Sequence, residues 1–331
     1  MRSKFNVCVI SVISLAALLA LAGCGGGEDQ VAAPPAVQST AVSGTAAKGI
    51  VKRAKVLVCR IVNGTPEPDA SCATGTTAAD GSFAVTLSDG FTGPAVVKVI
   101  TSAASTLLDE TTGADIPYDM TMRSVVPAVS SATIAYVTPF SEMAASLTVA
   151  SSLAANTSID AFAITLATGQ VQTLLSNLMA IDLAVKPVID LKNSGSDAVA
   201  LGKQANMVKQ LARLTMAAKR APDTFDTSGG VHCNTPGTSA SQQLACVVDV
   251  LSRAMTRGAN ATAFAISRIG PAIASENPTA VTMAIIKPDG TLGLEVADMT
   301  SATSMQSAMR NAGMPEAVVV SNVQIMMLQM R

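Results

Sequence analysis

The sequence predicts a multidomain α+β protein with an N-terminal antiparallel β-sandwich, a central helical domain and a small C-terminal α/β unit. Three observations lead to this prediction. Short segments rich in β-branched residues, separated by turn pairs, occupy residues 42–137. Apolar residues then recur at helical spacing through residues 138–278. Residues 279–331 contain a hairpin signal followed by two further apolar segments.

Residues 1–23 have the composition of an export signal. Arg2 and Lys4 are followed by an uncharged, mainly apolar run over residues 7–22, shorter than the ~20 residues that a membrane-spanning helix needs. This run ends in Leu21-Ala22-Gly23-Cys24, which resembles the lipobox of bacterial lipoproteins. The resemblance implies cleavage before Cys24 and attachment of lipid to Cys24, with the membrane as a partner. The alternative is an ordinary signal peptide with a chance cysteine.

Residues 24–41 lack periodicity and predict a flexible tether, because they contain a glycine run and the pair Pro34-Pro35. In lipoprotein sorting in Gram-negative bacteria, an aspartate after the lipidated cysteine favours the inner membrane. Gly25 occupies that position. The resemblance therefore implies the outer membrane, with the folded part on its periplasmic face or at the cell surface.

The sandwich is predicted from alternating apolar residues and from the turn pairs Asn63-Gly64 and Asp80-Gly81. Asp80 is also a conceivable calcium ligand, but no acidic cluster surrounds it, so a turn role is favoured. The expected strands are Val42–Ile50, Ala54–Ile61, Thr76–Leu87, Ala95–Ile100 and Ser131–Val137.

Two groups of residues in this region resemble a known domain. Val42-Ser43-Gly44 with Ala54-Lys55-Val56, and the turn from Thr77 to Phe83, are similar to carboxypeptidase regulatory-like, or transthyretin-like, β-sandwich repeats of bacterial surface proteins. The resemblance covers less than a third of the chain. It implies a non-catalytic spacer, adhesion or accessory domain.

Helical periodicity begins at Pro139, a residue suited to a first helical turn. The methionines of this region are expected to fill the core. The expected helices are Pro139–Ala154, Ser158–Met179, Ser196–Arg220, Ser239–Arg257 and Ala261–Ser275. The C-terminal unit is predicted as β-β-α-β, from strands Val281–Ile286 and Thr291–Ala297, helix Ser301–Ala312 and an apolar run, Ala317–Met330, that could also be helical.

Four cysteines remain once Cys8 leaves with the signal and Cys24 carries lipid. They form two local pairs with the same short spacing. In an oxidising compartment this pattern predicts the disulfides Cys59–Cys72 and Cys233–Cys246, each worth about 3 kcal/mol in the loop-entropy model. His232 beside Cys233 suggests a metal site as an alternative, but the spacing matches no zinc pattern. We therefore expect no metal and no cofactor.

The amino-acid composition argues against several classes of function. The 22 basic and 23 acidic residues nearly balance, which argues against nucleic-acid binding. There is no tryptophan for stacking on sugars, and the single histidine leaves few arrangements for nucleophilic catalysis. The remaining candidates for catalysis are carboxylates such as Asp109-Glu110 or Asp115, which would have to meet in three dimensions.

These observations favour a non-catalytic, lipid-anchored cell-envelope protein that binds another macromolecule, either a protein or an envelope polymer. Two alternatives remain. One is a lipoprotein that binds a glycan or a small ligand, and the other is a hydrolase with an unrecognised carboxylate site. Clustered carboxylates in a cleft would favour the hydrolase.

The lipid anchor can be tested with Cys24→Ser, which removes the thiol that would carry the lipid. We expect the variant in the soluble fraction after cell lysis and ultracentrifugation, whereas the wild-type chain sediments with membranes, because two or more acyl chains hold a protein firmly. Immunoblotting of the two fractions measures the partition. A variant that sediments like the wild-type chain would contradict the anchor.

Overall fold

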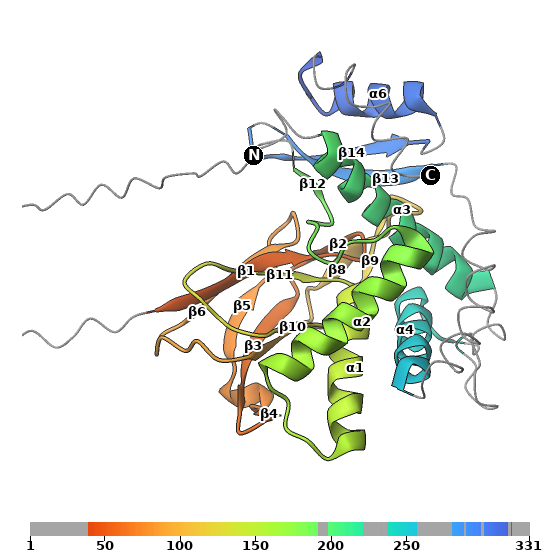
Figure 1. The fold of residues 1–331 in the computed structure, drawn as a ribbon. Helices are drawn as coiled ribbons and strands as arrows, with labels where there is room; N and C mark the ends of the chain where they lie inside the picture. Colours follow the sequence, from red (N-terminus) through yellow and green to blue (C-terminus); the bar gives the residue numbers. More distant parts are fainter. Residues whose placement is uncertain are drawn as a thin grey trace, which may run out of the picture. The chain divides into compact units, whose positions relative to one another are not determined.

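The computed structural model describes residues 39–190, 198–220, 233, 237–256, 280–287, 289–298, 301–316 and 319. They form an α+β fold in which a β-rich region is followed by helices and then by a β-hairpin with one helix (Figure 1). Within these residues, no helix has both the length and the apolar character to cross a membrane. Cys24, the predicted tether up to Gln38 and His232 lie outside the described residues.

Two sheets provide most of the β-rich region. One has the strand order β11-β1-β6, and the other has the order β10-β7-β3-β4 with β5 also paired to β3. The two sheets share one apolar core that includes Val42, Val85, Val56 and Val97. The strands are β1 (Thr40–Ala46), β3 (Lys55–Val62), β4 (Thr65–Pro66), β5 (Ala73–Thr76), β6 (Ser82–Leu87), β7 (Ala95–Ile100), β10 (Met122–Val126) and β11 (Thr133–Val137).

The pairing of β1 with β11 differs from the predicted antiparallel sandwich, because these two strands run parallel. They lie at opposite ends of the region, and a long connection permits parallel pairing where a hairpin would not. Gly44 faces Ala135 across this pair, and a Cβ on Gly44 would lie 1.8 Å from the Ala135 carbonyl oxygen. The close approach of β11 to β1 therefore requires glycine at this position.

A third, smaller sheet of the β-rich region has the order β2-β8-β9. Its strands are β2 (Ile50–Lys52), β8 (Thr106–Leu108) and β9 (Asp115–Pro117). Alternation in the sequence predicted neither β8 nor β9, since each spans only three residues.

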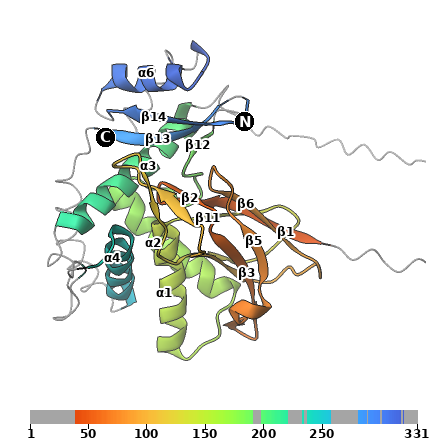
Figure 2. The same cartoon turned by 180° about the vertical axis from the view of Figure 1, so that it is seen from behind.

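The helices agree closely with the predicted ones: α1 (Pro139–Ala155), α2 (Ala161–Met179), α3 (Ala198–Arg220) and α4 (Ala240–Thr256). Thr138 caps α1 reciprocally with Ser141, whose backbone N–H donates to Thr138 Oγ1 at 3.1 Å. Asp160 caps α2. Figures 1 and 2 show α1 between α2, α4 and the sheet that contains β10, and these contacts bury Phe140 and Leu147. The predicted helix Ala261–Ser275 lies outside the described residues.

The C-terminal part consists of β13 (Val281–Ile286), β14 (Leu292–Ala297) and α6 (Ala302–Asn311). A two-residue strand that the sequence did not predict, β12 (Ile189–Asp190), joins β13 in parallel. Met283, Met305 and Met309 are buried together in the core of this part. The predicted last strand Ala317–Met330 lies outside the described residues except for Val319, which is helical.

Both predicted disulfides are present. Cys59 of β3 is bonded to Cys72, which precedes β5, and Cys233 is bonded to Cys246 of α4. Disulfides persist in oxidising compartments, so the two bonds indicate a location outside the cytoplasm.

A buried charge cluster connects the three parts of the chain. Lys48, between β1 and β2, and Glu110, after β8, are each only 1% exposed, and their charged atoms lie 3.3 Å apart. The carboxylate of Asp109 lies 3.6 Å from the same ammonium group. Thr215 of α3 donates a hydrogen bond to Glu110 Oε1, and the backbone N–H of Thr282 in β13 donates to the Glu110 carbonyl oxygen.

Removing the charge of Lys48 should lower the free energy of unfolding much more than removing that of Lys52, which pairs with Asp115 at the surface. We expect Lys48→Met to lower the free energy of unfolding by about 3–5 kcal/mol, because it leaves buried carboxylates without a counter-ion. Lys52→Met should cost less than about 1 kcal/mol. Urea unfolding followed by circular dichroism measures both. Equal losses would show that the cluster contributes no more than a surface pair.

Candidate functional site

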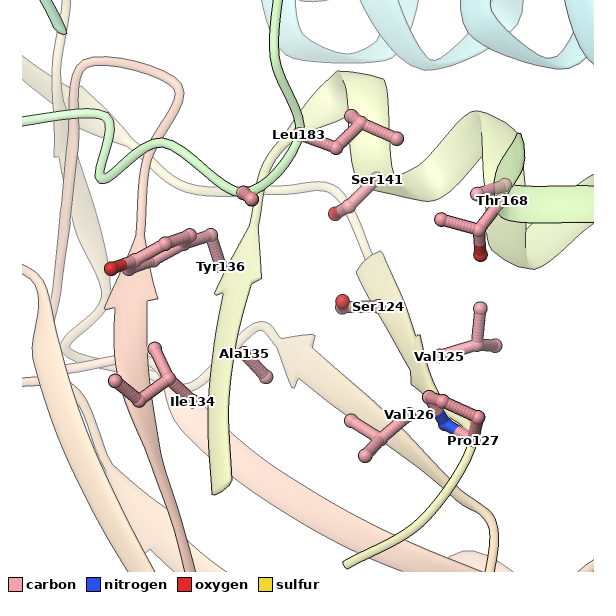
Figure 3. Close-up of a pocket in the computed structure, with 12 residues that line it drawn as sticks. Ser124, Val125, Val126, Pro127, Ile134, Ala135, Tyr136, Ser141, Thr168 and Leu183 are labelled. Atoms are coloured by element: carbon pink, nitrogen blue, oxygen red, sulfur yellow. The ribbon is translucent and has the colours of Figure 1, made fainter. Parts of the chain in front are cut away.

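An apolar cleft lies where the ends of β10 and β11 meet α1, α2 and the chain that follows α2 (Figure 3). Its volume is about 370 Å³, within the range of about 300–1,000 Å³ that is typical of ligand sites. The lining residues are Ser124, Val125, Val126, Pro127, Ile134, Ala135, Tyr136, Ser141, Ala144, Thr168, Leu183 and Ala184.

The cleft opens because β10 and β11 are edges of two different sheets. β10 pairs with β7, and β11 pairs with β1, so no ladder joins β10 to β11 in the described topology. Pro127 follows β10 directly, and Pro139 starts α1 only two residues after β11 ends. The two strands run in opposite directions, because the start of α1, which follows β11, lies beside Arg123 at the start of β10.

Hydrogen bonds show which way the strand backbones point. The Arg123 carbonyl accepts from Ser141 Oγ at 2.8 Å and so points away from β7, and Val125, two residues on, points the same way. The Val137 carbonyl accepts from the Ala47 N–H of the chain that follows β1, so the backbone groups of Ile134 point away from β1. The cleft is therefore bordered by outward-directed backbone groups of Val125 and Ile134.

The polar groups of the cleft are few. In Figure 3, Ser124 and Ser141 lie between Ala135 of β11 and Thr168 of α2. Ser141 Oγ is fixed, since it accepts from the Thr138 N–H at 2.8 Å and donates to a backbone carbonyl. Thr168 Oγ1 is buried and has no hydrogen-bond partner in the described part of the chain. The cleft thus offers an apolar surface with one unsatisfied hydroxyl.

The chemistry of this lining suits binding. The twelve residues include no acidic side chain, no basic side chain and no histidine. General acid–base catalysis needs a titratable group close to the reacting atoms, and the phenol of Tyr136 is the one such group in the lining.

The carboxylates singled out in the sequence do not meet in a cleft. Asp109 and Glu110 lie beside each other in the buried cluster with Lys48, and Asp115 pairs with Lys52 at the surface. This arrangement gives no support to a carboxylate dyad among the three.

Asp80 lies in its predicted turn, where its Oδ1 accepts from the backbone N–H of Ser82 at 3.0 Å and from the Ser82 hydroxyl at 2.6 Å. Partial burial tends to raise the pKa of Asp80, but the hydrogen bonds from Ser82 outweigh this effect and lower the pKa below its ordinary value. Both oxygen contacts belong to the turn itself, as expected for a turn residue.

One group of possible metal ligands occurs among the described residues. Atoms of Cys59, Asp69 and Cys72 lie within 4.8 Å of one another. The two sulfur atoms are bonded to each other, however, so neither is a thiolate that can bind a metal.

Sequence reasoning missed the cleft because its residues carry no distinctive chemistry. Val125 and Ala135 are ordinary strand residues, and they come together only through the parallel return of β11. The closest sequence signals are Pro127 and Pro139, which mark where both elements change direction.

The unsatisfied hydroxyl of Thr168 leads to a test by comparison with Thr148. Thr148 Oγ1 donates to the Ala144 carbonyl at 2.8 Å. We expect Thr148→Val to lower the unfolding free energy by about 1 kcal/mol, and Thr168→Val to be neutral or slightly stabilising, because it removes a polar atom without a partner. Thermal unfolding of both variants measures the difference. An equal loss for Thr168→Val would mean that its hydroxyl is satisfied.

Comparison with protein-family models, curated proteins and solved structures gave no match for this chain. The resemblances to the lipobox and to regulatory-like sandwich repeats therefore stay predictions from the residues that carry them. The cleft is likewise interpreted from its own geometry.

Proposed function

We propose that this protein is a non-catalytic, lipid-anchored cell-envelope protein that binds an extended, apolar segment of a protein partner in the cleft between β10 and β11. The observation that carries the proposal is the combination of an uncharged lining with outward-directed backbone groups of Val125 and Ile134. An extended peptide adds to exposed sheet edges through main-chain hydrogen bonds, and apolar pockets then select its side chains.

The cellular part of the proposal rests on the chain before the fold. The lipobox-like sequence ending at Cys24 supports a lipid anchor, and Gly25 supports the outer membrane. The two disulfides support a location outside the cytoplasm, which is where a lipoprotein of the outer membrane would lie. We further propose that the β-rich region is a sandwich of the carboxypeptidase regulatory-like kind and that the C-terminal part completes a β-β-α-β unit.

The proposal can be tested by photo-crosslinking in cells. A benzoylphenylalanine at Ile134, which is 63% exposed at the cleft, should form an adduct with a partner protein. The same group at Val296, 65% exposed on β14, should not form this adduct. Ala184→Trp fills the cleft from its exposed rim and should abolish the adduct at Ile134. Ala79→Trp, at an exposed turn, should leave it unchanged.

Two outcomes would contradict the proposal. One is the absence of any adduct at Ile134 in living cells. The other is an adduct that persists unchanged in the Ala184→Trp background, since a partner seated in the cleft would be displaced by the indole ring.

A further inference from the structure

A second pocket, of about 400 Å³, lies on the face of the β10-β7-β3 sheet that α1 covers. It is enclosed by the β3–β4 turn, β7, β10, the C-terminal half of α1 and the connection to α2. The lining residues are Gly64, Thr65, Pro66, Val96, Lys98, Arg123, Val125, Ala145, Val149, Ser152, Leu153, Thr157 and Ile159.

Two positive charges lie side by side in this pocket. Arg123 of β10 is the register partner of Lys98 of β7, so the two side chains leave the same face of the sheet with Cβ atoms about 5 Å apart. Like charges in such a pair destabilise a sheet unless negative charge compensates them. No carboxylate is among the residues that line the pocket. The lining therefore contributes two cationic groups and no anionic group.

The acidic partners of these residues lie outside the lining. Lys98 Nζ contacts Asp69 Oδ1 at 2.6 Å, and the Asp69 side chain is 57% exposed. Arg123 donates to the Glu142 carboxylate from both Nε and Nη2, the Nε contact being 3.0 Å, and its Nη2 also donates to Ser146 at 2.9 Å. An exposed ion pair such as Lys98–Asp69 contributes little to the free energy of unfolding. Lys98 can therefore leave Asp69 and contact a ligand with little loss of stability.

Hydrogen-bond donors remain for a ligand. The bonds of Arg123 involve Nε and Nη2, which leaves Nη1 without a partner in the described part of the chain, and the ammonium of Lys98 has three donors. Burial lowers the pKa of Arg123, but its hydrogen bond and charge interaction with Glu142 outweigh burial and raise the pKa. The guanidinium therefore stays charged.

Ser152 provides an independent observation. This α1 residue is only 5% exposed, lines the pocket, and its hydroxyl has no partner among the described residues. Thr148, one turn earlier, satisfies its own hydroxyl on the Ala144 carbonyl. A buried polar group without a partner is costly, and a ligand oxygen within the pocket would relieve that cost.

An apolar wall is formed by Val96, on the same face of β7 as Lys98, together with Val149 and Leu153 of α1 and Ile159. We propose that this pocket binds a small amphipathic carboxylate, with its carboxylate against Lys98 and Arg123 and its aliphatic chain against that wall. The two pockets share Val125 in their linings, but this inference does not rest on the proposed function.

Octanoate is a suitable probe, titrated calorimetrically into the full chain carrying Cys24→Ser so that no detergent competes. We expect saturable binding of octanoate, and no comparable binding of octylamine, octanol or acetate. Lys98→Met should raise the dissociation constant about tenfold or more, because a charge-assisted hydrogen bond is lost. Lys98→Arg should retain binding, and Ser152→Ala should weaken it.

Lys52→Met is the matched control, since Lys52 has a similar exposure and a similar surface partner in Asp115. It should bind octanoate like the wild-type chain, and so should the cleft-filling Ala184→Trp. Thermal unfolding of each variant separates a loss of binding from a loss of fold.

The proposal is overturned if octanoate does not bind, if octanol or octylamine binds equally well, or if Lys98→Met binds octanoate with wild-type affinity. Loss of octanoate binding in Ala184→Trp would also overturn it, because that result assigns octanoate to the first cleft.

Discussion

The buried cluster of Lys48, Asp109 and Glu110 is the constraint on which the rest of the structure depends. Moving a charge out of water costs several kcal/mol, and only close pairing and further hydrogen bonds offset that cost. Here Thr111 and Thr112 donate hydrogen bonds to the Asp109 carboxylate, and Thr215 of α3 donates one to the Glu110 carboxylate. Thr282 of β13 adds a backbone hydrogen bond to the Glu110 carbonyl oxygen. Residues far apart in the sequence must therefore meet at one point, and this fixes the helices and the C-terminal hairpin against the β-rich region.

The position of Lys48 in this cluster also explains why the next residue is a glycine. Gly49 follows Lys48 with φ of +68°, and a Cβ there would lie 1.6 Å from the Leu108 carbonyl oxygen. A left-handed residue in contact with β8 suits glycine alone. The turn between β1 and β2 thus brings the lysine to the carboxylates, and β1 then determines where β11 and the seam beside β10 lie.

Much of the fold could be predicted from the sequence because its elements are locally encoded. β7 and β13 have the predicted bounds, and α1, α2, α3 and α4 begin and end within a few residues of the predicted ones. The disulfides followed from the pairing of cysteines in an oxidising compartment. In each case the signal lies within a short stretch of chain: alternation, helical spacing, a capping residue or a local pair.

The rest could not be predicted because it depends on register and on long-range pairing. Nothing in residues 40–46 indicates a parallel partner nearly a hundred residues later. Lys98 and Arg123 are ordinary strand residues until the β7–β10 register places them opposite each other. Asp109 and Glu110 are adjacent carboxylates in the sequence, but the lysine that pairs with them is recognisable only in three dimensions.

The reciprocal cap at Thr138 and Ser141 has a consequence for the two pockets. It couples the end of β11 to the start of α1 without a flexible linker, and Ser141 Oγ also bonds to the Arg123 carbonyl of β10. One helix and one strand therefore form walls of both pockets. An occupant that displaces α1 in one pocket reshapes the other, and thermodynamic linkage requires that the resulting change in affinity be equal in both directions.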